Sequence, residues 1–213
     1  MERKLLYNYG ISWGLSLGEY ISYLKENNIH MKQDLIIKII LQIVNGLRDI
    51  HKCAHVDYSF NFKLIDFDLT VEEKKNKGKV STLLNQSVQP VFEGSVLYSS
   101  PEVMDNDIIS YKSDIWALGC IIYAMIKLRP SFNGDNPLNI AKNVCEGNYE
   151  RLTEKDFKFP EIIELVNNCL IVDWKKRINI NNVCPILGPF LFDYISETKS
   201  KEEQLQKEII DLI

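Results

Sequence analysis

Four residues in the first third of the chain carry side chains that could do chemistry together. Asp57, Asp66 and Asp68 supply three carboxylates within a short stretch, and Asn61 supplies an amide between them. Carboxylate oxygens suit hard cations such as Mg²⁺, and a carboxylate within reach of a hydroxyl can also act as a general base. Either use requires the rest of the chain to hold these groups in place, so the surrounding motifs decide between them.

Several motifs follow one another in a fixed order around these acids. Lys63-Leu64-Ile65 leads into Asp66-Phe67-Asp68 as a strand would, and the stretch Gly94 to Tyr98 precedes Ser99-Ser100-Pro101-Glu102 as a substrate-docking loop would. Ser113 to Gly119 follows shortly afterwards. In order and spacing these motifs resemble the activation segment of a eukaryotic protein kinase and the helix beneath it. Each motif alone is weak evidence for this resemblance, but the whole set in this order is strong evidence for it.

The stretch after that helix indicates which branch of the kinase family the chain resembles. Asn136 to Lys142, followed by Glu146 to Glu150, is similar to the corresponding stretch of the NIMA-related kinases, a serine/threonine branch. Another kinase branch with a short helix here is the alternative. The resemblance implies a mainly α, protein-kinase-like fold made of the large (C-terminal) lobe with a remnant of the small lobe. It also implies transfer of the ATP γ-phosphate to protein Ser or Thr.

The resemblance divides the chain into three expected parts. Residues 1–15 are expected to be a remnant of a small-lobe strand and hinge, residues 16–192 the large lobe, and residues 193–213 a helical tail. The sequence has no GxGxxG phosphate loop and no strand lysine in a Val-Ala-Ile-Lys context. Because kinases hold ATP with these two features, we expect weak or absent nucleotide binding.

By this resemblance Asp66 is the residue that holds Mg²⁺ between the ATP phosphates, which makes ATP and Mg²⁺ the implied cofactors. Asp68 stands where the family has Gly, whose missing side chain allows unusual backbone angles. Asp68 either reinforces cation binding or repels the phosphates, and a simple exposed loop acid is the third interpretation.

His55-Val56-Asp57 has two interpretations. It resembles the kinase His-Arg-Asp with the Arg lost, which would make Asp57 the general base and Asn61 a metal ligand. In the family, however, the Asn follows the Asp by five residues, and that position is Phe62. Aligned without a gap, the stretch instead matches the small hairpin before the Asp-Phe-Asp motif, with Asn61 in its turn. We favour this second interpretation, in which the catalytic loop is absent between residues 50 and 54, and we assign no catalytic residue.

Three other charged residues are expected, by resemblance, to hold the fold together. Glu102 is expected to form a buried ion pair with Arg177, far away in the sequence. Asp114 is expected to accept backbone N–H groups from the catalytic-loop region, if that region exists.

The composition agrees with one domain. The chain has 213 residues, of which 46% are hydrophobic and 25% charged, enough for a single sizeable core. A net charge of −4 favours neither nucleic acid nor an anionic membrane surface as a partner. Five cysteines without CxxC spacing argue against a disulfide framework or a zinc site, and no long apolar run marks a signal peptide or a membrane span. We therefore expect a cytoplasmic or nuclear protein.

Apolar residues at helical spacing predict a series of helices with loops between them. Asn136-Pro137 starts one of these helices, with Pro at a position where its missing N–H costs nothing. We expect Gly188-Pro189 to break the last helix of the lobe, and the tail from residue 196 to be either a packing helix or a partner-binding one. Helices are predicted at residues 17–25, 31–52, 112–128, 136–146, 161–171 and 178–192.

Three functions remain open at this point. The chain belongs to an active serine/threonine kinase of which this sequence is an incomplete version, or it is a pseudokinase that serves as an interaction or scaffold module, or it is a non-functional fragment. Without a general base, a metal-binding Asn, a phosphate loop or a strand lysine, the sequence as it stands predicts no catalysis. The expected partner is a protein substrate or a protein partner.

Overall fold

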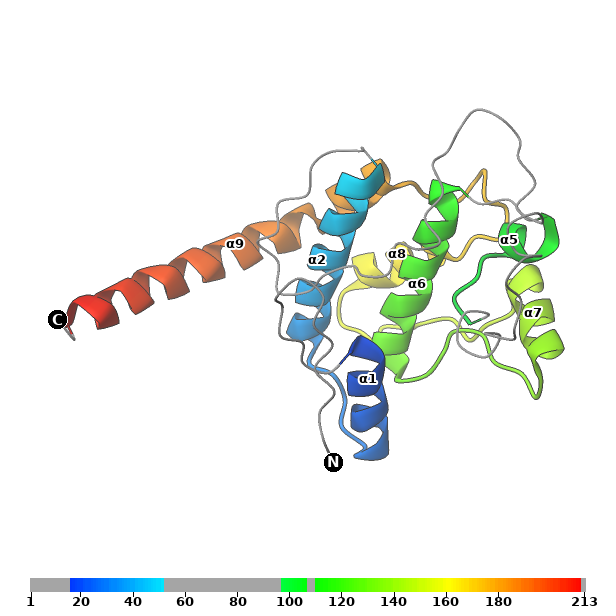
Figure 1. Cartoon of the computed structure of the whole chain (residues 1–213), viewed down its shortest axis with the longest axis horizontal. Coiled ribbons are helices and arrows are strands. Elements are labelled where there is room, and N and C mark those ends of the chain that lie inside the picture. The colour runs from blue at the N-terminus through cyan, green and yellow to red at the C-terminus, as the bar shows by residue number, and fades with distance from the viewer. Residues whose placement is uncertain (1–15, 52–96, 107–109, 212–213) are drawn as a thin grey trace, which may run out of the picture.

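The computed structural model describes residues 16–51, 97–106 and 110–211, and every regular element in these ranges is an α-helix (Figure 1). The prediction of a mainly α fold is therefore confirmed within these ranges. The predicted small-lobe remnant, residues 1–15, lies outside them. The helices are α1 (Leu17–Glu26), α2 (Gln33–His51), α5 (Pro101–Asn106), α6 (Tyr111–Lys127), α7 (Pro137–Glu146), α8 (Pro160–Cys169) and α9 (Ile180–Asp211).

Helix α6 is the centre of the core. It packs against α2 on one side and α8 on another, and α2 and α8 in turn pack against α9 (Figure 1). Because α6 is enclosed by other helices, apolar residues occur on nearly all of its faces. Its fully buried side chains include Trp116, Ile122, Tyr123 and Met125.

A glycine allows α6 and α8 to approach closely. A Cβ atom placed on Gly119 would lie 2.6 Å from the Cβ of Cys169, closer than two carbon atoms can pack. The glycine is therefore required by packing, in agreement with its position in the buried helix.

The ends of α6 and α7 are fixed by capping residues. Ser110 caps the start of α6 and accepts a hydrogen bond from the backbone N–H of Lys112. Asn136 caps α7 by accepting from the N–H of Asn139 at 2.9 Å, and Pro137 takes the first helical position as predicted. Helix α7 ends at Gly147, whose φ of 65° lies in the left-handed region that glycine tolerates.

Helix α9 runs without interruption through Pro185 and Pro189, so the predicted break at Gly188-Pro189 is wrong. Each proline removes a backbone hydrogen bond and usually ends or kinks a helix. Here Val183 and Leu187 are buried in the core on the same turns, and this packing holds the helical conformation against that cost.

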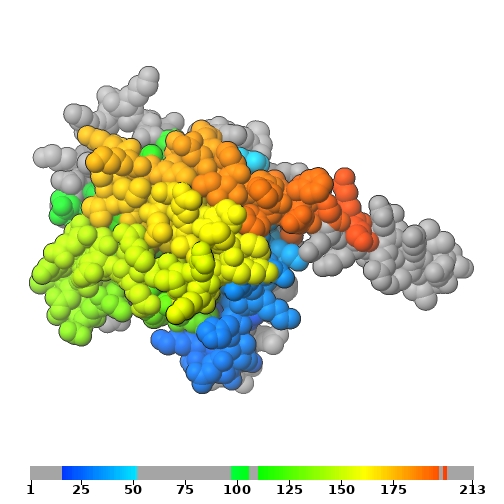
Figure 2. All heavy atoms as spheres, turned by 180° about the vertical axis from the view of Figure 1, so that it is seen from behind, coloured from blue at the N-terminus to red at the C-terminus, as the bar shows by residue number. Residues whose placement is uncertain are grey.

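The second half of α9 extends away from the other helices (Figure 1). The predicted boundary between lobe and tail at residue 192 falls inside this continuous helix. From behind, residues between α7 and the start of α9 form most of the surface, and α9 leaves the molecule at one side (Figure 2). In the described part of the chain, no helix combines the length and the apolar character needed to cross a membrane.

Candidate functional site

The residues predicted to handle nucleotide and metal lie outside the described part of the chain. These are Asp57, Asn61, Asp66 and Asp68. Within the described ranges, no group of three or more His, Cys, Asp or Glu side chains is placed to hold a metal ion. The described residues therefore do not supply a Mg²⁺ site by themselves, and we derive no step through ATP or Mg²⁺.

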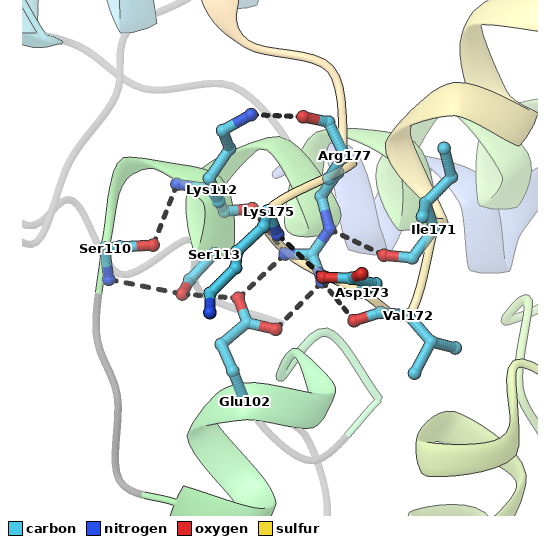
Figure 3. Close-up of polar contacts among 9 residues, drawn as sticks. All are labelled: Glu102, Ser110, Lys112, Ser113, Ile171, Val172, Asp173, Lys175 and Arg177. Carbon is cyan, nitrogen blue, oxygen red and sulfur yellow. Dashed lines mark hydrogen bonds and ion pairs between the residues drawn. The ribbon is translucent and has the colours of Figure 1, made fainter.

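The described part of the chain contains instead a cluster of polar contacts at the start of α5, the helix that follows the predicted docking loop in the sequence (Figure 3). Glu102, in the first turn of α5, faces Arg177 from the loop between α8 and α9. Nη1 of Arg177 lies 2.7 Å from Oε1 of Glu102, and Nη2 lies 2.8 Å from Oε2. The Glu102 side chain is 2% exposed and the Arg177 side chain is 0% exposed. The structure thus brings together two residues that are 75 positions apart in a bidentate, buried ion pair.

The guanidinium of Arg177 also donates to three backbone carbonyls, which belong to two segments of the chain. Nε donates to the carbonyl of Ile171 at 2.9 Å, Nη1 to that of Lys112 at 2.7 Å, and Nη2 to that of Val172 at 3.4 Å. Its Cζ atom lies 4.9 Å from the centre of the Trp116 ring. Because most of its donors are used, Arg177 is well satisfied despite complete burial.

Glu102 stays ionised because its partners outweigh its burial. Burial by itself would raise the pKa of this carboxyl, but the hydrogen bonds and the positive charge of Arg177 hold the pKa of Glu102 below its ordinary value of 4.5. Ser113 adds a hydrogen bond from its hydroxyl to Oε1 of Glu102 at 2.9 Å. We call Glu102, Ser113 and Arg177 the docking floor.

Lys112 brings a second cation to the edge of the docking floor. Its ammonium donates to the backbone carbonyl of Arg177. Burial and the neighbouring charge of Arg177 both lower the pKa of Lys112. The start of α6 is therefore fastened to the loop before α9 by both of these basic residues.

Asp114 has a partner that the sequence did not indicate. Its Oδ2 lies 2.8 Å from Nε2 of His51, the last residue of α2, and the His51 ring packs 4.7 Å from that of Tyr111. The predicted contact of Asp114 with the catalytic-loop region falls on residues outside the described ranges. No spacing rule links His51 to a residue 63 positions away, so sequence reasoning had no signal for this pair.

The described end of the docking loop consists of residues 97–100, which lead directly into α5. Tyr98 is 37% exposed on this segment, and partial burial of its ring raises the pKa of its hydroxyl. Tyr98 therefore offers a neutral, partly exposed aromatic ring on the segment that leads into α5.

Comparison with known proteins agrees with this arrangement. The sequence matches the protein kinase domain family over residues 14–186. It is 28% identical over 208 residues to the serine/threonine-protein kinase Nek10 of Homo sapiens, covering 92% of this chain and 17% of that protein. It is 30% identical over 163 residues to Nek9 of Xenopus laevis, covering 74% of this chain and 17% of that protein. The chain thus spans about a sixth of the length of these two relatives.

Proposed function

The chain belongs to the protein kinase family, and from this premise we propose that it is the large lobe of a NIMA-related serine/threonine kinase domain that binds proteins without transferring phosphate itself. In this proposal the chain serves as an interaction module. Its partner is a polypeptide that approaches the docking loop above α5.

The contrast between an intact docking floor and a missing catalytic loop supports this proposal. Residues 52–65 connect α2 to Asp66, and they contain no Asp that is followed five residues later by Asn. Kinases draw their base and a metal ligand from that pair. Because phosphoryl transfer depends on positioning and on charge stabilisation, the loss of both residues removes the chemistry, while Glu102 and Arg177 still support the loop above them.

An active kinase is the second candidate, because the relatives are named serine/threonine kinases and this chain spans only part of each. In that case His55-Val56-Asp57 would serve as the catalytic loop, with Asp57 as base and Asp66 as the ligand of Mg²⁺. Location in the cytoplasm or nucleus stays a prediction under both candidates.

A phosphotransfer assay separates the two candidates. We expect the whole chain, incubated with γ-labelled ATP, Mg²⁺ and a general serine/threonine substrate, to give no transfer above background and only a small thermal shift with Mg-ATP. Asp57→Asn and Asp66→Asn should leave both readings unchanged, as should the control Asp68→Asn. Robust transfer that Asp57→Asn and Asp66→Asn abolish would establish the active kinase instead.

A peptide-binding assay tests the interaction role directly. We expect a fluorescent degenerate library of Ser- and Thr-containing peptides to bind the chain, as measured by polarisation. Tyr98→Ala should weaken this binding because it removes the exposed ring of the docking loop. Tyr23→Ala, at a 51% exposed tyrosine on α1, is the matched control and should have no effect. Absence of binding, or equal loss in both variants, refutes the proposal.

A further inference from the structure

A polar pocket of about 390 Å³ lies between the loop that follows α6 and the segment that follows α7. Arg129, Ser131 and Asn133 line it from the loop, and Asn148 and Glu150 line it from the segment. Asn133, Asn148 and Glu150 are exposed, so the pocket opens to solvent, whereas Ser131 is only 3% exposed. A cavity with a few convergent polar groups is the usual form of a ligand site.

Alternate residues of the loop face this pocket. Arg129, Ser131 and Asn133 all line it. Phe132 points instead into the core, where it is 0% exposed and its ring stacks 5.3 Å from that of Trp116. This core contact fixes the orientation of the loop, and the three polar side chains are therefore held on the side of the pocket.

The hydroxyl of Ser131 is buried without a hydrogen-bond partner. The thiol of Cys120 lies near it, but sulfur is only a weak hydrogen-bonding group. Because a buried polar group is nearly always paired with protein, water or ligand, this hydroxyl indicates that a further molecule belongs in the pocket.

Arg129 and Asn133 have unused hydrogen-bonding capacity as well. Among the described residues, only Glu150 accepts a hydrogen bond from the guanidinium of Arg129, which has five donors. The side-chain amide of Asn133 forms no hydrogen bond within the same ranges, since only its backbone carbonyl is engaged, by Asn143 at 2.7 Å. The open side of the pocket thus offers a planar cation next to an amide.

The charges beside the pocket favour a ligand with one negative charge. Nζ of Lys127 lies 2.8 Å from Oε1 of Glu150 and 2.9 Å from Oδ1 of Asp156, and Arg129 holds the other oxygen of Glu150. Arg151 follows Glu150 in the sequence and has no carboxylate partner in the described part of the chain. Three cations against two carboxylates leave one positive charge, which a single carboxylate neutralises and a phosphate dianion exceeds.

We propose that this pocket binds the carboxylate of an acidic side chain in a polypeptide partner. Arg129 offers the paired donors that match a carboxylate, and the hydroxyl of Ser131 gains the partner that it lacks. The amide of Asn133 can both donate to and accept from the peptide group beside the acidic side chain. The inference rests on the proposed function for the source of the carboxylate, because an interaction module binds polypeptides.

Blocked amino acids test the pocket in the whole chain. We expect N-acetyl-glutamate N-methylamide to shift the side-chain NMR signals of Arg129 and Asn133 in a saturable manner, and the blocked glutamine analogue to leave them unchanged. Acetate should bind more weakly than blocked glutamate, because it has no peptide group for Asn133. Equal binding of acetate would show a site for small free acids and would overturn the polypeptide source.

Three variants separate ligand binding from folding. Arg129→Gln should weaken the binding of blocked glutamate at least about tenfold, and Ser131→Ala about three- to tenfold, as expected for losing a charged and a neutral hydrogen bond. Ser131→Ala should leave the thermal unfolding midpoint unchanged, because the hydroxyl has no hydrogen bond to lose in the free protein. Lys142→Gln is the matched control, since it removes the same charge from a 68% exposed position of α7 outside the pocket.

Absence of saturable binding by blocked glutamate overturns the proposal. Binding that survives both Arg129→Gln and Ser131→Ala, or that falls equally in Lys142→Gln, overturns it too. If blocked glutamate fails to bind while the Ser- and Thr-containing peptide library binds, the pocket assignment alone is wrong. If blocked glutamate binds at the pocket while the library does not bind, the proposed role of the docking loop is wrong instead.

Discussion

Replacing Arg177 by Ala removes the cation that neutralises a carboxylate inside the protein. Glu102 is 3% exposed, and its oxygens lie 2.7 and 2.8 Å from the two terminal nitrogens of Arg177. In the variant no charged partner remains in that contact, and the hydroxyl of Ser113 at 2.9 Å is a neutral donor. We expect Arg177→Ala to lower the free energy of unfolding by about 3–5 kcal/mol at neutral pH, because a buried charge is left unpaired.

Replacing Glu102 by Gln should lower the free energy of unfolding less than replacing Arg177 by Ala. In Glu102→Gln the Arg177 guanidinium still donates to three backbone carbonyls, those of Ile171, Lys112 and Val172. A glutamine also keeps an oxygen that can accept from Arg177. We expect a loss of about 1–3 kcal/mol, the range for impairing a buried hydrogen bond. The predicted order, with Arg177→Ala worse than Glu102→Gln, follows from how many partners each side chain retains.

The effect of Arg177→Ala should also depend on pH in a definite direction. In the wild type the folded-state pKa of Glu102 lies below 4.5. The contribution of ionised Glu102 to the free energy of unfolding is therefore complete above pH 4.5 and is lost as the pH falls through the folded-state pKa. Without Arg177, burial raises the pKa of Glu102, and protonation then relieves the unpaired charge in mild acid. The stability difference between wild type and variant should shrink from neutral pH to about pH 5.

Urea unfolding followed by far-ultraviolet circular dichroism measures these differences. Lys176→Ala is the matched control, because Lys176 is adjacent in sequence, its side chain is 78% exposed, and it pairs only at the surface with Asp173. It should change stability by less than about 0.5 kcal/mol. An Arg177→Ala midpoint equal to that of the wild type, or a cost that grows in acid, would refute the reasoning.

Three further experiments test the packing of α6 against α8, the burial of two cysteine thiols and the cap of α7. Gly119→Ala should cost about 1–3 kcal/mol in urea unfolding, because the new Cβ would lie 2.6 Å from the Cβ of Cys169; Gly18→Ala, with open space around it, should cost nothing. Cys120 and Cys169 should resist a thiol reagent until the protein unfolds, because burial shields both and raises the pKa of Cys120 to about 12; labelling of either thiol in the native protein would contradict this. Asn136→Ala should cost about 1 kcal/mol through the lost cap of α7, whereas Asn136→Asp should retain the cap, as thermal unfolding can show.

The helices that could be predicted are those whose apolar spacing reflects their packing. The stretch predicted at residues 112–128 is observed as Tyr111–Lys127, and the one at 136–146 as Pro137–Glu146. In both cases the local signals, an apolar pattern and a capping residue, agree with the tertiary environment. Helix α5 has only six residues, too few to show a period, and it was not predicted.

The remaining differences arise from contacts between distant parts of the chain. The continuity of α9 through Pro189 depends on packing that local sequence does not reveal, and the pairing of His51 with Asp114 depends on how α2 and α6 cross. The expectation that Glu102 faces Arg177 came from motif resemblance, since their separation carries no periodic signal. Asp66 lies outside the described residues, so its role stays a prediction.

Two neighbouring residues at the start of α6 hold both ends of the long segment that joins α2 to α5. Asp114 contacts His51, immediately before residue 52, and Ser113 contacts Glu102, shortly after residue 96. Both ends of this segment are therefore fixed at one place by contacts that lie within the helical lobe itself. We therefore expect insertions or deletions between these two contacts to leave the helical lobe folded, so that the lobe tolerates a change of length in this segment.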